Sequence, residues 1–210
     1  MKKKMILGIL LAVFATFASY AQYVNEDGFH YFDHYFIDMV DGELVVGGWV
    51  EIFDYTGPSR AISIPPSLMG EPPRIAVEAF FDKQLTSVTI PNGITVIGQG
   101  AFHTNLLTTI TIPNSVTEIG IGAFMNNRLT SITIGSGVKY IGEVTFAGNP
   151  ITSITIGAGV NINDEAFIGH VEADGTFFSN NFVEFYNAQG RLAGTYTRPN
   201  ARSTAWTRSR

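Results

Sequence analysis

Two histidines and a carboxylate lie close together near the start of the chain, in the segment His30-x-x-Asp33-His34. Two imidazoles and a carboxylate are a donor set that could hold zinc. The segment reads as strand and loop, so side chains four residues apart need not share a face. We therefore expect no metal site and no bound cofactor.

Other residue types that do chemistry occur without the arrangement that catalysis needs. Asp164-Glu165 and the pair Glu51 and Asp54 supply carboxylates, yet nothing distinguishes a general acid from a general base. Serine is plentiful, but no nucleophile elbow or base-orienting partner is visible. Glycine pairs such as Gly98-x-Gly100 resemble phosphate-binding loops but lack the following helix that a nucleotide site requires. The sequence predicts no catalytic residue and a protein that is not an enzyme.

The first 21 residues have the organisation of a secretory signal peptide. Three lysines precede an apolar run from Met5 to Ala18, and Ser19-Tyr20-Ala21 places small residues at positions −3 and −1. The run is shorter than the roughly 20 residues of a membrane-spanning helix. We expect cleavage after Ala21 and export to the periplasm, the outer surface or the medium. An uncleaved membrane anchor is the alternative.

The composition restricts the partners further. The chain contains no cysteine, so it has neither disulfides nor thiolate metal ligands. Loss of the three signal-peptide lysines moves the formal net charge from −5 to −8, which argues against nucleic acid. Residues 22–190 hold all 18 acidic side chains, whereas residues 191–210 hold five arginines and no acid. We interpret this end as a solvated basic tail, with contact to a membrane surface or an acidic partner as the alternative.

A repeat of 22 residues occupies the middle of the chain. Segments such as Thr109–Ile112 alternate branched apolar residues with threonine, which predicts half-buried strands. An Ile-Gly pair later in each unit is expected to mark a second turn, and one phenylalanine per unit is expected to stack on the next. The spacing of 22 residues is clearest in three rows: Leu85, Leu107, Leu129, Ile151; Phe80, Phe102, Phe124, Phe146; and Asn105, Asn127, Asn149. The asparagines are predicted to bond to backbone groups that lack a strand partner.

One such unit cannot fold alone, because it buries too little apolar surface, so the units must stack into a solenoid with capped ends. The pattern Leu-x-x-Ile-x-Ile-Pro-x-x-Val-x-x-Ile-Gly-x-x-Ala-Phe-x-x-Asn, over about residues 36–170, resembles the treponemal-type, or BspA-like, leucine-rich repeats. The resemblance implies an arc-shaped leucine-rich-repeat solenoid with a parallel β-sheet on its concave face and short turns or 3-10 segments elsewhere. It also implies an exported or surface-bound bacterial protein, since members are implicated in adhesion to host proteins and other cells.

The ends of the chain are predicted to cap the solenoid. Residues 23–36 are unusually aromatic, residues 168–181 are read as a loop, and residues 182–197 as two strands joined by a turn at Asn187–Gly190. The predicted organisation is a signal peptide (1–21), an N-terminal cap (22–60), repeats (61–170), and a C-terminal loop, hairpin cap and basic tail (171–210).

The predicted binding surface is the open face of the repeat strands. With the branched residues pointing inward, a field of hydroxyls and methyls points outward: Ser87, Thr89, Thr109, Thr111, Ser131, Thr133, Ser153 and Thr155. Such a field suits broad contact with a protein or a glycan, although Thr and Ser also favour the exposed face of any sheet. Phe177 and Phe178 belong either to the cap core or to an exposed apolar patch.

The sequence therefore favours an exported recognition module that binds a protein on a host or bacterial surface through its concave face and the flanking loops. The alternative is a solenoid that self-assembles or binds a small apolar ligand through its aromatic ends. The residues of that alternative are Phe29 to Phe36, Trp49, Phe53, Phe177 and Phe178.

Overall fold

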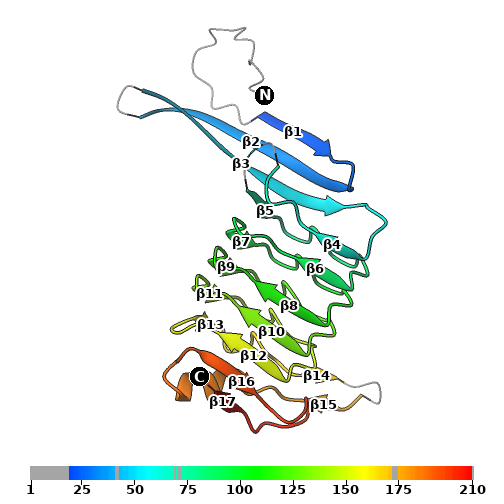
Figure 1. The fold of residues 1–210 in the computed structure, drawn as a ribbon, viewed down its shortest axis with the longest axis vertical. Helices are drawn as coiled ribbons and strands as arrows, with labels where there is room; N and C mark the ends of the chain where they lie inside the picture. Colours follow the sequence, from blue (N-terminus) through cyan, green and yellow to red (C-terminus); the bar gives the residue numbers. More distant parts are fainter. Residues whose placement is uncertain (1–18, 41–42, 69, 71, 172–174, 210) are drawn as a thin grey trace.

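The computed structural model describes residues 19–40, 43–68, 70, 72–171 and 175–209. The chain winds into a stack of coils with a long N-terminal strand pair at one end and a helix with a short hairpin at the other (Figure 1). This confirms the stacked parallel solenoid that the repeat predicts. The predicted signal peptide falls mostly in residues 1–18, outside the described residues, and stays a prediction.

The longer repeat strands form one wall of the solenoid. They are β4 (Ala61–Ser63), β6 (Ser87–Thr89), β8 (Thr109–Ile112), β10 (Ser131–Ile134) and β12 (Ser153–Ile156). β8, β10 and β12 pair in parallel, and Ser131 lies opposite both Thr109 and Ser153, one repeat away on either side. β4 pairs in parallel with β6. Paired residues are 22 positions apart in β8, β10 and β12, which is the repeat length, and 26 positions apart in β4 and β6, so equivalent residues form straight rows.

A second sheet forms at the Ile-Gly pairs, where the sequence suggested only a turn. Its repeat strands are β5 (Pro73–Ile75), β7 (Val96–Ile97), β9 (Glu118–Ile119), β11 (Tyr140–Ile141) and β13 (Asn161–Ile162). The sheet continues into the N-terminal strands β3 (Glu43–Tyr55), β2 (Phe29–Val40) and β1 (Ser19–Val24). Two-residue strands carry almost no periodicity in the sequence, and their parallel neighbours in adjacent coils stabilise them.

Glycine follows Ile97, Ile119 and Ile141 of the second sheet because the coils approach each other there through their backbones. A Cβ on Gly98 would lie 2.6 Å from the carbonyl carbon of Ala76. The amide of Gly98 donates to the carbonyl of Ile75 at 2.9 Å. A larger residue would push adjacent coils apart.

Phenylalanine rings stack through the centre of the solenoid as predicted. The ring centroids of Phe102 and Phe124 lie 5.2 Å apart with planes inclined by 9°, and those of Phe124 and Phe146 lie 5.5 Å apart at 4°. At each end of the stack a cap residue meets the last ring edge-on: Phe29 at the N-terminal end and Phe182 at the C-terminal end. Aromatic packing thus continues from one cap to the other.

The asparagine rows bond to backbone groups as predicted. Asn127 Oδ1 accepts from the amide of Leu107 at 3.1 Å, while Nδ2 donates to the carbonyls of Phe102 at 2.9 Å and Phe124 at 3.1 Å. Asn105 and Asn149 make the equivalent bonds one repeat away. Each side chain therefore links adjacent coils at the bend before the long strand.

The C-terminal cap corrects the prediction for residues 182–197. The segment begins with helix α1 (Phe182–Ala188), which is followed by strand β16 (Gly194–Thr197), and it is not a hairpin. Phe182, Val183 and Tyr186 are all buried, a spacing that places them on one face of a helix but would split adjacent residues between the two faces of a strand. Tyr186 Oη donates to the carbonyl of Gly157 at 2.7 Å, which fixes the helix over the last coil.

The predicted loop at 168–181 is also partly wrong, because β14 (His170–Val171) and β15 (Phe177–Phe178) pair in an antiparallel manner. His170 stands three residues after Phe167, in the slot that asparagine occupies in earlier repeats, and is buried like them. The short pair extends the cap beside the last coil (Figure 1).

The arginine-rich end is structured where the sequence suggested a solvated tail. Strand β17 (Thr207–Ser209) pairs with β16, and Arg198 is only 5% exposed. Its Nε donates to the carbonyl of Ile151 at 2.7 Å and its Nη1 to that of Ser203 at 2.9 Å. Burial lowers the pKa of this guanidinium, which still keeps its proton at neutral pH. Arg198 therefore fastens the C-terminal hairpin to the last repeat.

An ion pair joins the N-terminal cap to the first coil and gives a pH-dependent prediction. Lys83 Nζ lies 2.7 Å from Asp54 Oδ1. Burial raises the pKa of Asp54, but the hydrogen bonds from Lys83 and the Tyr55 amide outweigh it and hold the pKa below 3.8. A carboxyl with a lowered pKa stabilises the fold above its unfolded pKa and loses that contribution as pH falls through its folded pKa.

We expect Lys83→Met to cost about 0.2–1 kcal/mol at neutral pH, the range of surface pairs, and close to nothing near pH 2. Urea unfolding at both pH values measures this difference. Lys139→Met, which changes the same charge at an exposed position, is the control. An equal loss at both pH values would contradict the ion-pair explanation.

Candidate functional site

The predicted hydroxyl residues lie together on one surface. Their neighbours in sequence, such as Ile110 and Ile132, are buried, whereas Thr109, Thr111 and Thr133 are exposed. Strand pairing places Thr111, Thr133 and Thr155 in one row and Thr109, Ser131 and Ser153 in the other. At the N-terminal end, β4 places Ser63 beside Thr89 and Ala61 beside Ser87. Neighbouring strands are about 4.8 Å apart, so hydroxyls recur at that interval.

The C-terminal cap lengthens both rows, which the sequence analysis missed. β16 pairs with β12 so that Thr195 lies opposite Thr155, with their hydroxyl oxygens 3.0 Å apart. Thr197 lies opposite Ser153, and Thr207 and Ser209 of β17 follow in the next positions. The repeated pattern Thr-x-Thr at 195–197, the same as at 109–111, was the available signal. We call the outward residues of these seven strands the hydroxyl face.

The hydroxyl face has the same uncharged character along its length. Its members are Ala61, Ser63, Ser87, Thr89, Thr109, Thr111, Ser131, Thr133, Ser153, Thr155, Thr195, Thr197, Thr207 and Ser209. Among the residues that the structure describes, the hydroxyls of Thr109, Thr111 and Thr133 have no intramolecular partner. By contrast, Thr152 Oγ1, just outside the face, donates to the carbonyl of Thr130. The centre of the face therefore presents hydroxyls that can bond to another molecule.

Comparison with known families decides what the stacked coils are. The family model of the BspA type leucine rich repeat region matches residues 51–187 in six copies. The chain belongs to this family. The leucine-rich-repeat solenoid predicted from the residue pattern is thereby confirmed.

Three solved structures of bacterial proteins are similar to the chain. A leucine rich cell surface protein from Faecalibacterium prausnitzii is 20% identical, with a TM-score of 0.43 over 77% of this chain and 61% of its own. A leucine-rich repeat protein from Eubacterium ventriosum is 18% identical (TM-score 0.35; 86% and 49% covered), and the pneumococcal vaccine antigen PcpA is 15% identical (0.30; 76% and 54%). The chain spans roughly half to three-fifths of each. No curated protein matches it.

The histidine cluster does not assemble in this BspA-type protein. His30 Nε2 lies 2.8 Å from Thr56 Oγ1 and its ring meets Phe53, whereas Asp33 is buried on the opposite face of β2. The side chain of His34 lies outside the described part. Over the residues that the structure describes, no group of three or more His, Cys, Asp or Glu side chains could hold a metal ion. The residues that the structure describes also contain no helix that is long and apolar enough to cross a membrane.

The aromatic ends of the repeat stack divide into two groups. Phe29 and Tyr55 are buried against Phe80, so they are cap core. Phe32 and Phe53 stack at 4.2 Å on the other face of the N-terminal sheet and are half-buried.

At the C-terminal end Phe178 is half-buried, with its ring against His170 and Arg202 above it. Phe178 thus contributes to the packing of the cap. The side chain of Phe177 lies outside the described part, so its assignment as a contact residue stays a prediction.

Proposed function

We propose that this BspA-type protein is an exported, non-catalytic recognition module that binds a protein partner through the hydroxyl face. The observation that carries the proposal is the double row of hydroxyls that the paired strands β8, β10, β12, β16 and β17 carry, with unpaired members on β8 and β10. An uncharged surface of this kind offers many weak polar contacts over a large area, and its Ala, Ser and Thr residues include no carboxylate, imidazole or amine for acid–base chemistry. Adhesion to a host or bacterial surface is the role that fits.

The fold supports this use because the hydroxyl face contributes little to stability. Apolar burial, ring stacking and the asparagine bonds lie on the inner side of the strands, so outward residues can change without loss of the core. Substitutions on this face can therefore alter the contact with a partner while the fold is retained.

The decisive experiment replaces Thr111 and Thr133 together with glutamate. We expect saturable binding to a panel of host matrix proteins to weaken about tenfold or more, since two buried carboxylates would each be desolvated without a partner. The melting temperature should stay within a few degrees, because both side chains are exposed. Surface plasmon resonance with circular dichroism on the same samples measures both quantities.

Thr95→Glu with Thr117→Glu is the matched control, since both residues are exposed and lie 22 positions apart beside the second sheet, as Thr111 and Thr133 do on the hydroxyl face. This variant should bind like the unmodified protein. Absence of saturable binding to every member of a broad panel, or an equal loss in the control, would count against the hydroxyl face.

A further inference from the structure

The strands that carry the hydroxyl face end differently at the two ends of the solenoid. At the C-terminal end β16 and β17 extend the five-stranded sheet of β8, β10 and β12, whereas at the N-terminal end β4 and β6 form a separate pair, and among the described residues no further strand pairs with β4. The N-terminal strands β1, β2 and β3 extend the other sheet instead. β4 is therefore an edge strand, and edge strands are the places where an extended peptide can add to a sheet.

The backbone of β4 is oriented for such an addition. The carbonyl of Arg60 accepts from the amide of Thr86, and the amide of Ile64 donates to the carbonyl of Thr89, so the even-numbered residues bond to β6. In a parallel strand, the backbone groups of one residue bond to the strand on one side and those of the next residue point to the other side. The amide and carbonyl groups of Ala61 and Ser63 therefore point away from β6. The hydroxyl of Ser59 bonds to both groups of Ala61, which leaves those of Ser63 for a ligand.

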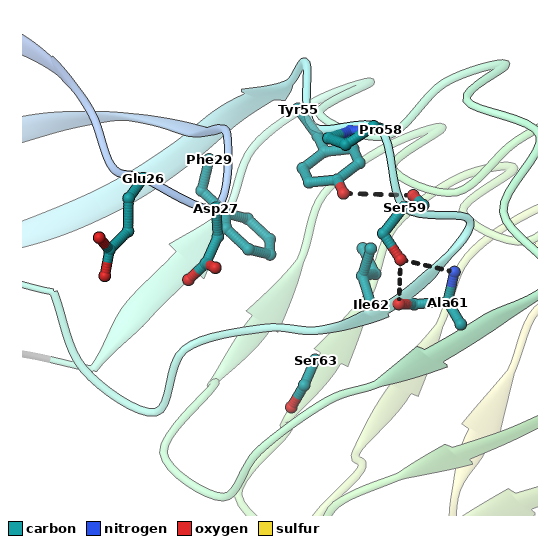
Figure 2. A pocket seen from close by; sticks show the side chains of 9 residues that line it. All are labelled: Glu26, Asp27, Phe29, Tyr55, Pro58, Ser59, Ala61, Ile62 and Ser63. Atoms are coloured by element: carbon teal, nitrogen blue, oxygen red, sulfur yellow. Dashed lines mark hydrogen bonds between the residues drawn. The ribbon is translucent and has the colours of Figure 1, made fainter.

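A cavity of about 490 Å³ lies along this open edge. We call it the N-terminal pocket. It is lined by Glu26, Asp27, Phe29, Tyr55, Pro58, Ser59, Ala61, Ile62 and Ser63. Figure 2 shows the carboxylates of Glu26 and Asp27 hanging from one turn on the same side, with the Tyr55 ring and the β4 residues across from them.

The walls of the N-terminal pocket are held in place before any ligand arrives. Asn25 Oδ1 accepts from the amides of Asp27 at 3.1 Å and Phe29 at 2.9 Å, which fixes the turn that carries the acids. Gly28 has φ of +87°, and a Cβ there would lie 2.4 Å from the amide nitrogen of Gly57, so the turn rests directly on the next loop. On that loop Tyr55 Oη donates to the carbonyl of Ser59. Preformed walls reduce the ordering cost of binding.

The chemistry of the lining selects a cation. Two carboxylates line the pocket and no basic side chain does, and neither Glu26 nor Asp27 forms an ion pair within the described residues. The exposed apolar atoms of Pro58 and Ala61 in the lining suit the methylene stem of a long basic side chain, and the two carboxylates attract its charge. The excess of acid over base in residues 22–190 favours the same sign of partner.

We propose that the N-terminal pocket receives a lysine or arginine side chain of an extended partner segment whose backbone pairs with β4 at Ser63. The proposal rests on the protein-binding function above and names the chemistry of the partner. The added segment would continue the hydroxyl face by one strand, and the basic side chain would determine its register on the edge.

The probe for this site is a fluorescent nine-residue peptide of serine and threonine with one central lysine, compared with a twin that has norleucine at that position. Norleucine keeps the stem and removes the charge. Fluorescence anisotropy with the full chain should show about tenfold weaker binding of the norleucine peptide. In the variant Glu26→Gln with Asp27→Asn, the two peptides should bind within about twofold of each other.

The control variant is Asp164→Asn with Glu165→Gln, which removes the same charge from exposed positions in the last repeat. It should retain the preference for lysine. Equal affinity of the two peptides for the unmodified protein, or an equal loss in the control, would overturn the proposal. Self-association that disappears in the Glu26 and Asp27 variant would also overturn it, since it would assign the pocket to a second copy of this chain.

Thr111→Glu with Thr133→Glu separates this proposal from the function of the hydroxyl face. These residues lie on β8 and β10, away from β4, so the variant should bind the lysine peptide normally. Lost partner binding with retained peptide binding supports both proposals. Lost partner binding without any lysine preference in the unmodified protein rejects only the pocket.

Discussion

Replacement of Asn127 with alanine is expected to lower the free energy of unfolding by about 3–5 kcal/mol, as several buried backbone groups lose their partners at once. The amide of Leu107 loses its acceptor, and the carbonyls of Phe102 and Phe124 each lose a donor. Water cannot replace the side chain readily because Asn127 is only 6% exposed and Leu107 is fully buried. An unpaired buried amide or carbonyl costs about 1–3 kcal/mol.

Urea unfolding followed by circular dichroism measures the effect of this substitution. Asn126→Gly is the matched control, because Asn126 is exposed, has φ of +54° and holds no backbone group of the adjacent coil with its side chain. Glycine tolerates that φ, so the control should change stability by less than about 1 kcal/mol. Similar losses in both variants would show that the bend, rather than the amide of Asn127, stabilises the coil.

The repeats could be predicted well because each of their constraints recurs. The burial of Ile110 and Ile132, the stack through Phe102 and Phe124 and the bonds of Asn127 each follow from a residue type that returns after 22 positions. Recurrence lets one unit confirm another, and the hydroxyl rows followed from the same argument. Outside the repeats this redundancy is lost.

The caps could not be predicted in the same way, since each of their elements occurs once. The sequence around Phe182 and Val183 is compatible with either a strand or a short helix. The helix forms where Phe182 packs edge-on against the ring of Phe167, and this contact cannot be read from the sequence. Arg198 looked like a tail residue because its partners, the carbonyls of Ile151 and Ser203, are backbone groups with no signature in the sequence. The N-terminal pocket likewise depends on where a turn and an edge strand meet.

Replacement of Phe124 with alanine is the second large effect, expected to cost about 3–5 kcal/mol. The ring is fully buried and contacts Phe102 on one side and Phe146 on the other, so the cavity would interrupt the aromatic stack at its centre. Because each coil contacts only its neighbours, the interruption should also weaken the coupling between the two halves. We expect urea unfolding to become broader as well as earlier, with the halves no longer melting together.

The position of the ring, and not only its size, determines this outcome. Phe81→Ala removes the same side chain from a 42% exposed site and should cost well under half as much, with the transition still sharp. Hydrogen exchange should show the two halves of the Phe124→Ala protein opening with different free energies, whereas in the unmodified chain they open together. A single sharp transition for Phe124→Ala, merely shifted to lower urea, would mean that the strand ladders and asparagine bonds couple the coils without the ring stack.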